Sequence, residues 1–324
     1  MKKISILLLA LFLATMCEAS KFNRIIYPIK TEDASKYILE QSKVPERIIS
    51  ASPAVTEILF TFNLQDKIVG VTKNCDYPEA VKQIRKIGDK KIDVNKSVKL
   101  KPDLVILALS DYSTDELASM RKNRFMTTVT FETWLGEIST EVREVSLEVF
   151  AVDPKSMTDV LNMIDTIGTI TNREHAAYSL NQRLKRRIEW VAARAKNEKR
   201  LKGYMLTSKR PLMVAGEGTY LSDILEIAGI NNLAPKNKGM FIKLNRKDIE
   251  KAGLDIIITS TSVARNEKDV YNDRSFRKTN VGKNKKAVCI DKELLMRPGP
   301  RITEALTQIA EKTYGWSKDE KTEE

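Results

Sequence analysis

Two short stretches of the chain share one pattern. Residues 95–107 and residues 247–259 each begin with a polar segment long enough for one or two helical turns. A sharp break and an aspartate (Asp103 or Asp255) follow, and then a run of apolar residues. That run is too short for a helix and too continuous for a half-exposed strand, so it is typical of a parallel strand covered by helices on both faces. The duplication predicts two similar α/β lobes, and two lobes predict a ligand-binding cleft between them.

The rest of the chain continues this alternation. Strands are predicted at 47–52, 68–72, 104–109, 125–131, 149–152, 204–208, 212–215 and 256–259, and around Cys289. Helices are predicted from Pro53, at 156–167 with Gly168 as the stop, at 220–228, and beyond Pro300 with Ile302, Leu306, Ile309 and Ala310 on one face. Alternating elements of these lengths indicate doubly wound or related α/β lobes.

The longest uninterrupted helix is predicted between the two halves. Neither Gly nor Pro occurs from Thr171 to Lys202, and Thr171 and Glu174 have the spacing of a capping box. Apolar residues recur every three or four positions and form one stripe: Ala177, Leu180, Leu184, Ile188, Val191 and Ala195. About 25 residues make a rod of about 37 Å. Such a rod is a stiff linker, so we expect little hinge closure between the lobes.

The chain begins with the pattern of an export signal. A basic start is followed by an apolar run at 4–14, too short to span a bilayer, and by Cys17-Glu18-Ala19, which has the form of a cleavage site. Cys17 offers a second route, lipidation, because Leu13-Ala14-Thr15 precedes it as in a lipoprotein signal, although Met16 is bulkier than the usual neighbour. By either route the mature protein is exported and is periplasmic or extracellular.

These features divide the chain into five parts. They are a signal peptide at 1–19, an N-terminal α/β lobe at 20–170, an inter-lobe helix at 171–200, a C-terminal α/β lobe at 201–316 and a disordered tail at 317–324. The tail is assigned from its composition, which is dominated by Lys, Asp, Glu and Thr. The roughly 305 residues that remain after export exceed what one core usually carries.

Charge and cysteine content limit the partners. The formal net charge of +12 falls to +11 when the signal peptide, with two lysines and one glutamate, is removed. Nucleic acid is not expected as a partner, because the protein is exported and its lysines are spread along the chain without interleaved aromatics. An anionic ligand, an anionic membrane face and an ordinary solvated surface remain as explanations. Disulfides do not hold the fold, since only Cys75 and Cys289 remain, although the compartment would allow them to pair.

The sequence contains no catalytic constellation. His175 is the only histidine, so a metal site with two or three histidines is excluded and a His-based triad would depend on this residue alone. Gly216-Glu217-Gly218 follows a strand and has the form of a phosphate-cradling turn or of an ordinary strand-to-helix turn, and the full dinucleotide fingerprint is absent. The sequence therefore predicts a binding protein that has no cofactor of its own, rather than an enzyme.

The cleft should be lined by the loops at the carboxyl ends of the strands. Those loops carry Asn74, Asp76, Tyr77, Gly88, Lys90, Lys91, Ser110, Tyr112, Thr219, Tyr220, Lys238, Phe241 and Arg297. Aromatic rings with basic side chains between them suit a planar or anionic chelate. The residues predicted to bind the ligand are Asn74, Tyr77, Lys90, Tyr112, Tyr220, Phe241 and Arg297, with the tyrosines stacking or hydrogen-bonding and the arginine pairing with negative groups.

Several motifs in combination resemble one known family. They are residues 47–59 (Arg-Ile-Ile-Ser-Ala-Ser-Pro-Ala-Val-Thr-Glu-Ile-Leu), 70–72, 75–78, 101–105, 215–219 and 297–301, which occur in order within residues 46–315. The chain resembles helical-backbone (class III) periplasmic substrate-binding proteins of ABC importers for cobalamin, haem or ferric siderophores. The resemblance implies two Rossmann-like lobes joined by one long rigid helix, a metal-containing ligand and an ABC permease as partner; we expect a monomer. The segment at about 120–147, with Trp134, is longer than the family's usual connection.

At the cleft, the chain departs from the cobalamin-binding members of that family. Those members commonly have aromatic residues at the positions of Asn74, Lys90 and Ala108, and only Phe241 keeps its aromatic character. With lysines near the cleft, these departures favour an anionic ferric chelate over cobalamin.

The positions that dock the permease also differ. The resemblance implies one docking glutamate per lobe, at Asn95 or Lys96 in one lobe and at Lys247 or Arg246 in the other. Because these residues are neutral or basic, a partner permease should carry altered charges. The leading hypothesis is a non-enzymatic receptor that delivers a metal chelate to an ABC importer. The lost acids also support a second one, the same fold repurposed as a sensor or interaction module independent of transport.

Overall fold

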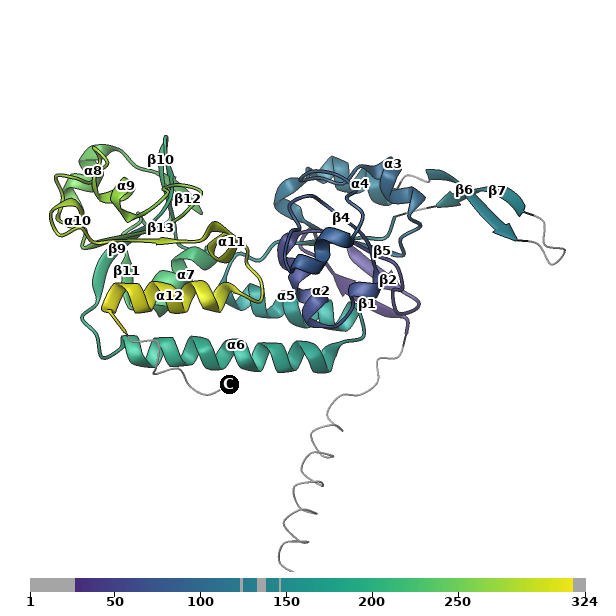
Figure 1. Ribbon diagram of the computed structural model, residues 1–324, viewed down its shortest axis with the longest axis horizontal. Helices are drawn as coiled ribbons and strands as arrows, with labels where there is room; N and C mark the ends of the chain where they lie inside the picture. Colours follow the sequence, from purple (N-terminus) through teal and green to yellow (C-terminus); the bar gives the residue numbers. More distant parts are fainter. Residues whose placement is uncertain (1–26, 123–124, 133–137, 146, 317–324) are drawn as a thin grey trace, which may run out of the picture.

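The computed structural model describes residues 27–122, 125–132, 138–145 and 147–316. Two α/β lobes lie side by side, and the helix α6 (Glu174–Ala195) runs along both of them (Figure 1). The predicted two-lobe arrangement with one long connecting helix is therefore confirmed. The predictions for the signal peptide, for Trp134 and for the tail at 317–324 lie outside the described residues.

The N-terminal lobe contains a parallel sheet. Its strand order is β4 (Ile68–Val71), β3 (Ile48–Ala51), β5 (Leu104–Ala108) and β8 (Val149–Val152), and every neighbouring pair is parallel. The helices of this lobe are α2 (Pro53–Thr61), α3 (Val94–Lys99), α4 (Thr114–Lys122) and α5 (Met157–Ile170), with 3-10 turns at Gln65–Lys67, Glu79–Gln83 and Leu109–Asp111. A small antiparallel pair, β1 (Ile29–Glu32) and β2 (Ile38–Gln41), precedes the sheet.

The C-terminal lobe contains a mixed sheet. Its order is β12 (Phe241–Lys243), β10 (Leu212–Ala215), β9 (Leu201–Lys209), β13 (Ile256–Ser260) and β14 (Ala287–Ile290), with β11 (Ile230–Asn232) also on β9. The pairs β9–β13, β13–β14 and β9–β11 are parallel, whereas β10 pairs antiparallel with β9 and β12. The helices are α7 (Tyr220–Ile227), α8 (Arg246–Lys251), α9 (Glu267–Tyr271), α10 (Asn280–Lys283), α11 (Lys292–Leu295) and α12 (Ile302–Tyr314). The lobes are thus alike in their parallel part only.

The duplicated pattern has the same geometry in both lobes. After α3 the chain turns through Lys101, with φ of 47°, and after α8 through Gly253, with φ of 62°. The carboxylate of Asp103 accepts hydrogen bonds of 2.8 Å from the backbone N–H groups of Glu46 and Arg47, and that of Asp255 accepts one of 2.8 Å from Lys202. Each aspartate therefore fixes the start of its strand to the start of the neighbouring parallel strand.

The apolar stripe predicted for the long helix is confirmed, but the predicted start of the helix is not. Its apolar residues are buried, except Ile188, which is partly buried against the same core. However, α6 begins at Glu174 without a side-chain cap, and Thr171 ends α5 by donating its hydroxyl to the carbonyl of Ile167 at 2.6 Å. Because Thr171 belongs to the end of the preceding helix, the predicted capping box is wrong.

Gly168 does not end α5, which continues to Ile170. A Cβ atom at position 168 would lie 2.5 Å from the Cβ of Ala177 on α6, far inside van der Waals contact. The glycine is therefore a close-packing residue between α5 and α6 rather than a stop. Spacing along the sequence cannot distinguish these two roles, because both place a glycine near the end of an apolar helix.

A hairpin extends from the N-terminal lobe between α4 and β8 (Figure 1). Its strands, β6 (Phe125–Glu132) and β7 (Ile138–Val145), pair antiparallel along their full length and form a separate two-stranded sheet. The predicted strand at 125–131 exists, but it does not join the sheet of the lobe, and β7 was not predicted.

One apolar core runs through both lobes. It includes Ile48 of β3, Ile164 of α5, Leu184 of α6 and Ile309 of α12. A continuous core supports the prediction of a stiff connection, because opening the lobes would expose packed side chains. The two cysteines do not form a disulfide. Cys75 in the N-terminal lobe and Cys289 in the C-terminal lobe are both free and buried.

We expect Gly168→Val to destabilise the protein by about 1–2 kcal/mol, because the added methyl groups must push α5 away from Ala177. Urea unfolding of the purified protein measures this change. The matched control is Asn162→Val, at an exposed position of the same helix, which should stay within about 0.5 kcal/mol of the unaltered chain. Equal stability of the two variants would contradict the close-packing role.

Candidate functional site

A cavity of about 870 Å³ lies between the lobes. From the N-terminal lobe it is lined by loops that follow β3, β4, β5 and β8, so the carboxyl ends of all four parallel strands face it, as the rule for open α/β sheets predicts. The C-terminal lobe contributes the start of α7, the residues around β12, and the segment from α11 to Pro298. This cavity is the candidate binding site.

Five of the seven residues predicted to bind the ligand line this cavity: Asn74, Lys90, Tyr220, Phe241 and Arg297. Asp76, Ser110 and Thr219 from the predicted loops line it as well. The hydroxyl of Thr219 accepts a hydrogen bond of 3.1 Å from the N–H of Ser222 and so caps α7, which fixes Tyr220 at the first position of that helix. Burial raises the pKa of Tyr220. Its phenol is therefore protonated and remains a hydrogen-bond donor.

Tyr77 and Tyr112 do not line the inter-lobe cavity, although their loops were expected to. The ring of Tyr77 lies under the guanidinium of Arg301, 3.7 Å from the ring centroid. The hydroxyl of Tyr112 accepts a hydrogen bond of 2.8 Å from the N–H of Ile92, and burial raises its pKa to about 12. Both rings are used within the structure, and loop position alone did not reveal these contacts. Gly88, Lys91 and Lys238 are also absent from the lining.

Methionines form a part of the lining that sequence reasoning missed. Met163, Met240 and Met296 border the cavity together with Phe241. Phe241 is 50 % exposed and Met296 is 40 % exposed, both unusual for large apolar residues. Thioethers are polarizable and adapt to irregular ligands. Two of these methionines precede predicted site residues, Phe241 and Arg297, and this adjacency was the available signal.

The cavity is close to electrically neutral, with five cationic side chains and four carboxylates in its lining. Every cation is paired with a carboxylate of the chain: Lys73 with Asp89 at 2.6 Å, Lys90 with Asp111 at 2.7 Å, Lys155 with Asp153 at 2.5 Å, Lys292 with Glu293 at 3.2 Å, and Arg297 with Asp76 at 2.8 Å. In the four lysine pairs the lysine side chain is 45–68 % exposed, and pairs open to solvent in this way contribute little to stability. An anionic ligand could therefore exchange with the partners of the lysines at low cost.

Arg297 bridges the two lobes. Its guanidinium donates to the carboxylate of Asp76 and, at 3.2 Å, to the carbonyl of Asn74, both in the N-terminal lobe, and it is also paired with Glu293. Burial alone would raise the pKa of Asp76, but the hydrogen bond and positive charge of Arg297 outweigh it and hold the pKa below its usual value. Arg297 is thus already occupied by carboxylates of the chain, which limits its predicted role of pairing with a ligand.

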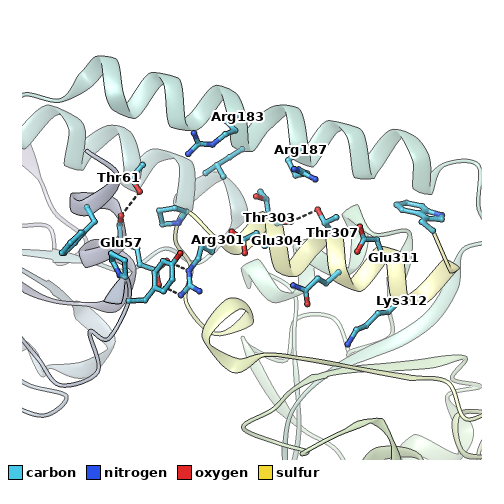
Figure 2. A pocket seen from close by; sticks show the side chains of 17 residues that line it. Glu57, Thr61, Arg183, Arg187, Arg301, Thr303, Glu304, Thr307, Glu311 and Lys312 are labelled. Carbon is cyan, nitrogen blue, oxygen red and sulfur yellow. Dashed lines mark hydrogen bonds and ion pairs between the residues drawn. The ribbon is translucent and has the colours of Figure 1, made fainter. Parts of the chain in front are cut away.

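Arg301 forms a second bridge, which Figure 2 shows at close range. It holds both carboxylate oxygens of Glu57 on α2, at 2.9 Å and 2.6 Å. The side chain of Glu57 is only 3 % exposed, and Arg297 lies 3.6 Å from it. The hydrogen bond to Glu57 raises the pKa of Arg301. Two arginines that precede α12 therefore join the C-terminal lobe to α2 of the N-terminal lobe through one buried carboxylate.

A second cavity, of about 1020 Å³, lies between α2, α6 and α12 (Figure 2). Arg183 and Arg187 of α6 line it on one side, and Glu304 and Glu311 of α12 on the other. Glu57 and Arg301 line this cavity, whereas Asp76 and Arg297 line the inter-lobe cavity, so the ion-pair network lies between the two. The inter-lobe cavity remains the candidate site, because it lies at the carboxyl ends of the strands and exposes apolar residues.

Within the described parts of the chain, no three His, Cys, Asp or Glu side chains are grouped so as to hold a metal ion. None of the helices described combines the length and apolar character needed to cross a bilayer.

Two α/β lobes on one long helix, with a cavity at their strand ends, define a ligand-binding receptor. Residues 48–294 match the model of a family described as periplasmic binding protein, and the chain belongs to this family. Members of this family are binding components of transport and not enzymes, which confirms the prediction of a non-enzymatic protein.

Three similar proteins illustrate the relationship. The chain is 27 % identical over 294 residues to the uncharacterized ABC transporter substrate-binding lipoprotein YvrC of Bacillus subtilis (strain 168), covering 89 % of this chain and 86 % of the relative. It is 23 % identical over 269 residues to a vitamin B12-binding protein of Vibrio cholerae, covering 82 % and 87 %. The solved structure of the periplasmic heme-binding protein HutB of Vibrio cholerae is 21 % identical with a TM-score of 0.68, covering 83 % and 98 %, and shows the fold.

We expect Glu57→Gln to destabilise the protein by on the order of 3 kcal/mol, because it leaves two guanidiniums without their shared buried carboxylate. Thermal and urea unfolding measure the loss. Glu189→Gln is the matched control: it changes an exposed glutamate of α6 that forms no ion pair within the described residues, and it should be nearly neutral. A Glu57→Gln protein as stable as the control would show that the network does not hold the lobes together.

Proposed function

We propose that the chain is an exported substrate-binding protein that captures a metal chelate in the inter-lobe cavity and delivers it to an ABC importer. The observation that carries this proposal is the cavity itself. Both lobes line it, the N-terminal lobe at the carboxyl ends of its four parallel strands, and it exposes Phe241 and Met296 to solvent. A volume of about 870 Å³ falls within the range of 300–1,000 Å³ that is typical of pockets for drug-sized ligands.

The lining supports a large ligand with both apolar and charged parts. Phe241, Tyr220 and the methionines offer apolar contact, and the lysines offer charge that can move from their present partners to a ligand anion. We propose that the metal enters as part of the ligand and that the chain carries no cofactor of its own. These features favour an anionic ferric siderophore, with haem and cobalamin as the alternatives in the same class.

The comparisons support this class of ligand without selecting one member. A vitamin B12-binding protein and a heme-binding protein are both similar to the chain. The alternative, a transport-independent sensor or interaction module, gains no support, because the Bacillus relative is named as an ABC transporter substrate-binding protein.

We further propose that the location of the mature protein depends on how its signal peptide is processed. Cleavage after Ala19 gives a free protein in the periplasm or outside the cell, whereas a lipid on Cys17 gives an anchored one. The Bacillus relative is a lipoprotein by name, which supports the second route. Mass spectrometry of the mature N-terminus separates the two.

The surface that we propose for permease docking is formed by α3 and α8. Asn95, Lys96 and Lys247 are exposed there, and Arg246 is paired with Glu250 at 3.0 Å. The helices belong to different lobes and lie at the same edge of the molecule, opposite α6 (Figure 1). A permease could therefore contact both lobes at once.

Ligand binding is expected to depend on Phe241. Phe241→Ala should weaken binding about tenfold or more in titration calorimetry, because the ring is the largest exposed apolar group in the lining. A thermal-shift screen with cobalamin, haem and ferric siderophores would identify the ligand first; at hundredfold excess over its Kd, a true ligand stabilises by about 2.7 kcal/mol.

The matched control for Phe241→Ala is Tyr178→Ala, which removes a ring that is 49 % exposed on α6, outside the cavity lining. It should leave the affinity unchanged. Tyr220→Ala should also weaken binding, at a cost in stability because this ring packs against the core. Unchanged affinity in both Tyr220→Ala and Phe241→Ala would remove these residues from the site, and absence of any thermal shift would count against the chelate-binding function.

Docking is expected to depend on positive charge at α8. Lys247→Glu should weaken the complex with the chain's own permease, measured by capture of the permease in nanodiscs, because the partner surface should be acidic. Lys185→Glu, at an exposed position of α6, is the control with the same change of charge. Tighter binding by the Lys247→Glu protein would show that the permease keeps basic docking pockets.

A further inference from the structure

A run of unpaired positive charge lies in the C-terminal lobe, between α9 and β14. Six basic residues and no acidic one occur at 274–286: Arg274, Arg277, Lys278, Lys283, Lys285 and Lys286. Their charge equals half of the chain's net charge of +12. All are exposed except Lys286, which is half-buried, and none of them forms an ion pair with another described residue. We call these six residues the basic patch.

The backbone under the basic patch is firmly anchored. Phe276 and Val281 are completely buried and pack in one apolar cluster with Ile249 of α8 and Val270 of α9. A Cβ atom at Gly282 would lie 2.4 Å from the Cα of Arg277, so the glycine lets the two halves of the patch approach closely. The segment that carries the basic patch, which includes α10, therefore lies at the end of the lobe where α8 and α9 also lie (Figure 1).

The basic patch differs from the cations of the inter-lobe cavity. In the cavity each cation is paired with a carboxylate, so an incoming anion must displace that partner. The basic patch has no such partner within the described residues, and its aromatic ring, Phe276, is buried and cannot stack on a nucleic-acid base. The patch also lines neither of the two large cavities. A broad surface of negative charge fits these properties better than a small ligand or a single-stranded nucleic acid.

We propose that the basic patch binds the anionic headgroups of a lipid bilayer. Each lysine or arginine held near such a surface strengthens attachment by about fivefold. This inference rests on the proposed function, because only an exported receptor that works with a membrane permease would meet the outer face of that bilayer. The attachment keeps the receptor near the permease, and with a lipid on Cys17 it supplies the second signal that stable anchoring requires.

Vesicle co-sedimentation of the mature chain tests the proposal. The protein should bind vesicles of phosphatidylcholine mixed with phosphatidylglycerol and not vesicles of phosphatidylcholine alone. Raising the salt from roughly 50 mM to 300 mM should release it, because the charges are exposed to solvent. Replacing Arg277, Lys278, Lys283 and Lys285 by glutamine should weaken binding by about tenfold or more.

The control variant carries glutamine at Lys185, Arg186, Lys196 and Lys199, four exposed basic residues of α6 and the segment after it. Both variants lose the same charge, so equal loss of vesicle binding would assign the effect to net charge and overturn the proposal. Salt-insensitive binding, equal binding to neutral vesicles, or tighter binding to duplex DNA than to anionic vesicles would also overturn it.

Chelate affinity of the basic-patch variant, measured by calorimetry, separates this inference from the proposed function. We expect it to be unchanged, because the patch residues do not line the cavity. Loss of vesicle binding with intact chelate binding supports the proposal. Intact chelate binding in a protein that never binds anionic vesicles would overturn the membrane inference alone.

Discussion

The placement of the two lobes depends on one buried carboxylate. Glu57 of α2 receives Arg301 through both oxygens and lies close to Arg297, and both arginines come from the segment that leads into α12. Single ion pairs across a domain boundary contribute little when exposed, but a carboxylate with 3 % exposure is costly to leave without its partners. The network therefore fixes the lobes relative to each other, and the shared apolar core along α5, α6 and α12 acts in the same direction.

A fixed pair of lobes has a consequence for binding. A receptor that closes around its ligand can create the site as it closes, whereas this one must present its site before the ligand arrives. The exposed Phe241 and Met296 are consistent with a preformed site, since both lose solvent contact only when something occupies the cavity. The ion pairs of the cavity also suit a preformed site. They hold five cations in place, and the paired carboxylates prevent a strong positive field that would attract small ions.

The sequence was informative where a local rule decides the structure. The duplicated strand with its leading aspartate predicts two lobes because one hydrogen-bonding role recurs in both, at Asp103 and Asp255. It was uninformative where contacts come from distant segments. Gly168 acts through Ala177 on another helix, and Tyr77 is held by Arg301, more than two hundred positions away. The hairpin of β6 and β7 follows the same logic, because one apolar run does not reveal which strand it pairs with.

The distribution of charge separates two tasks that the net charge of +12 combines. In the cavity, positive groups are balanced by carboxylates, so selectivity can come from shape, apolar contact and exchange of partners. At 274–286 six positive groups lie together with no acidic residue among them, on a backbone anchored by Phe276 and Val281. Charge that is balanced suits recognition of a particular molecule, and charge that is left unbalanced suits attraction to an extended anionic surface. We therefore assign the excess positive charge of this protein to the proposed contact with an anionic bilayer rather than to binding of its ligand.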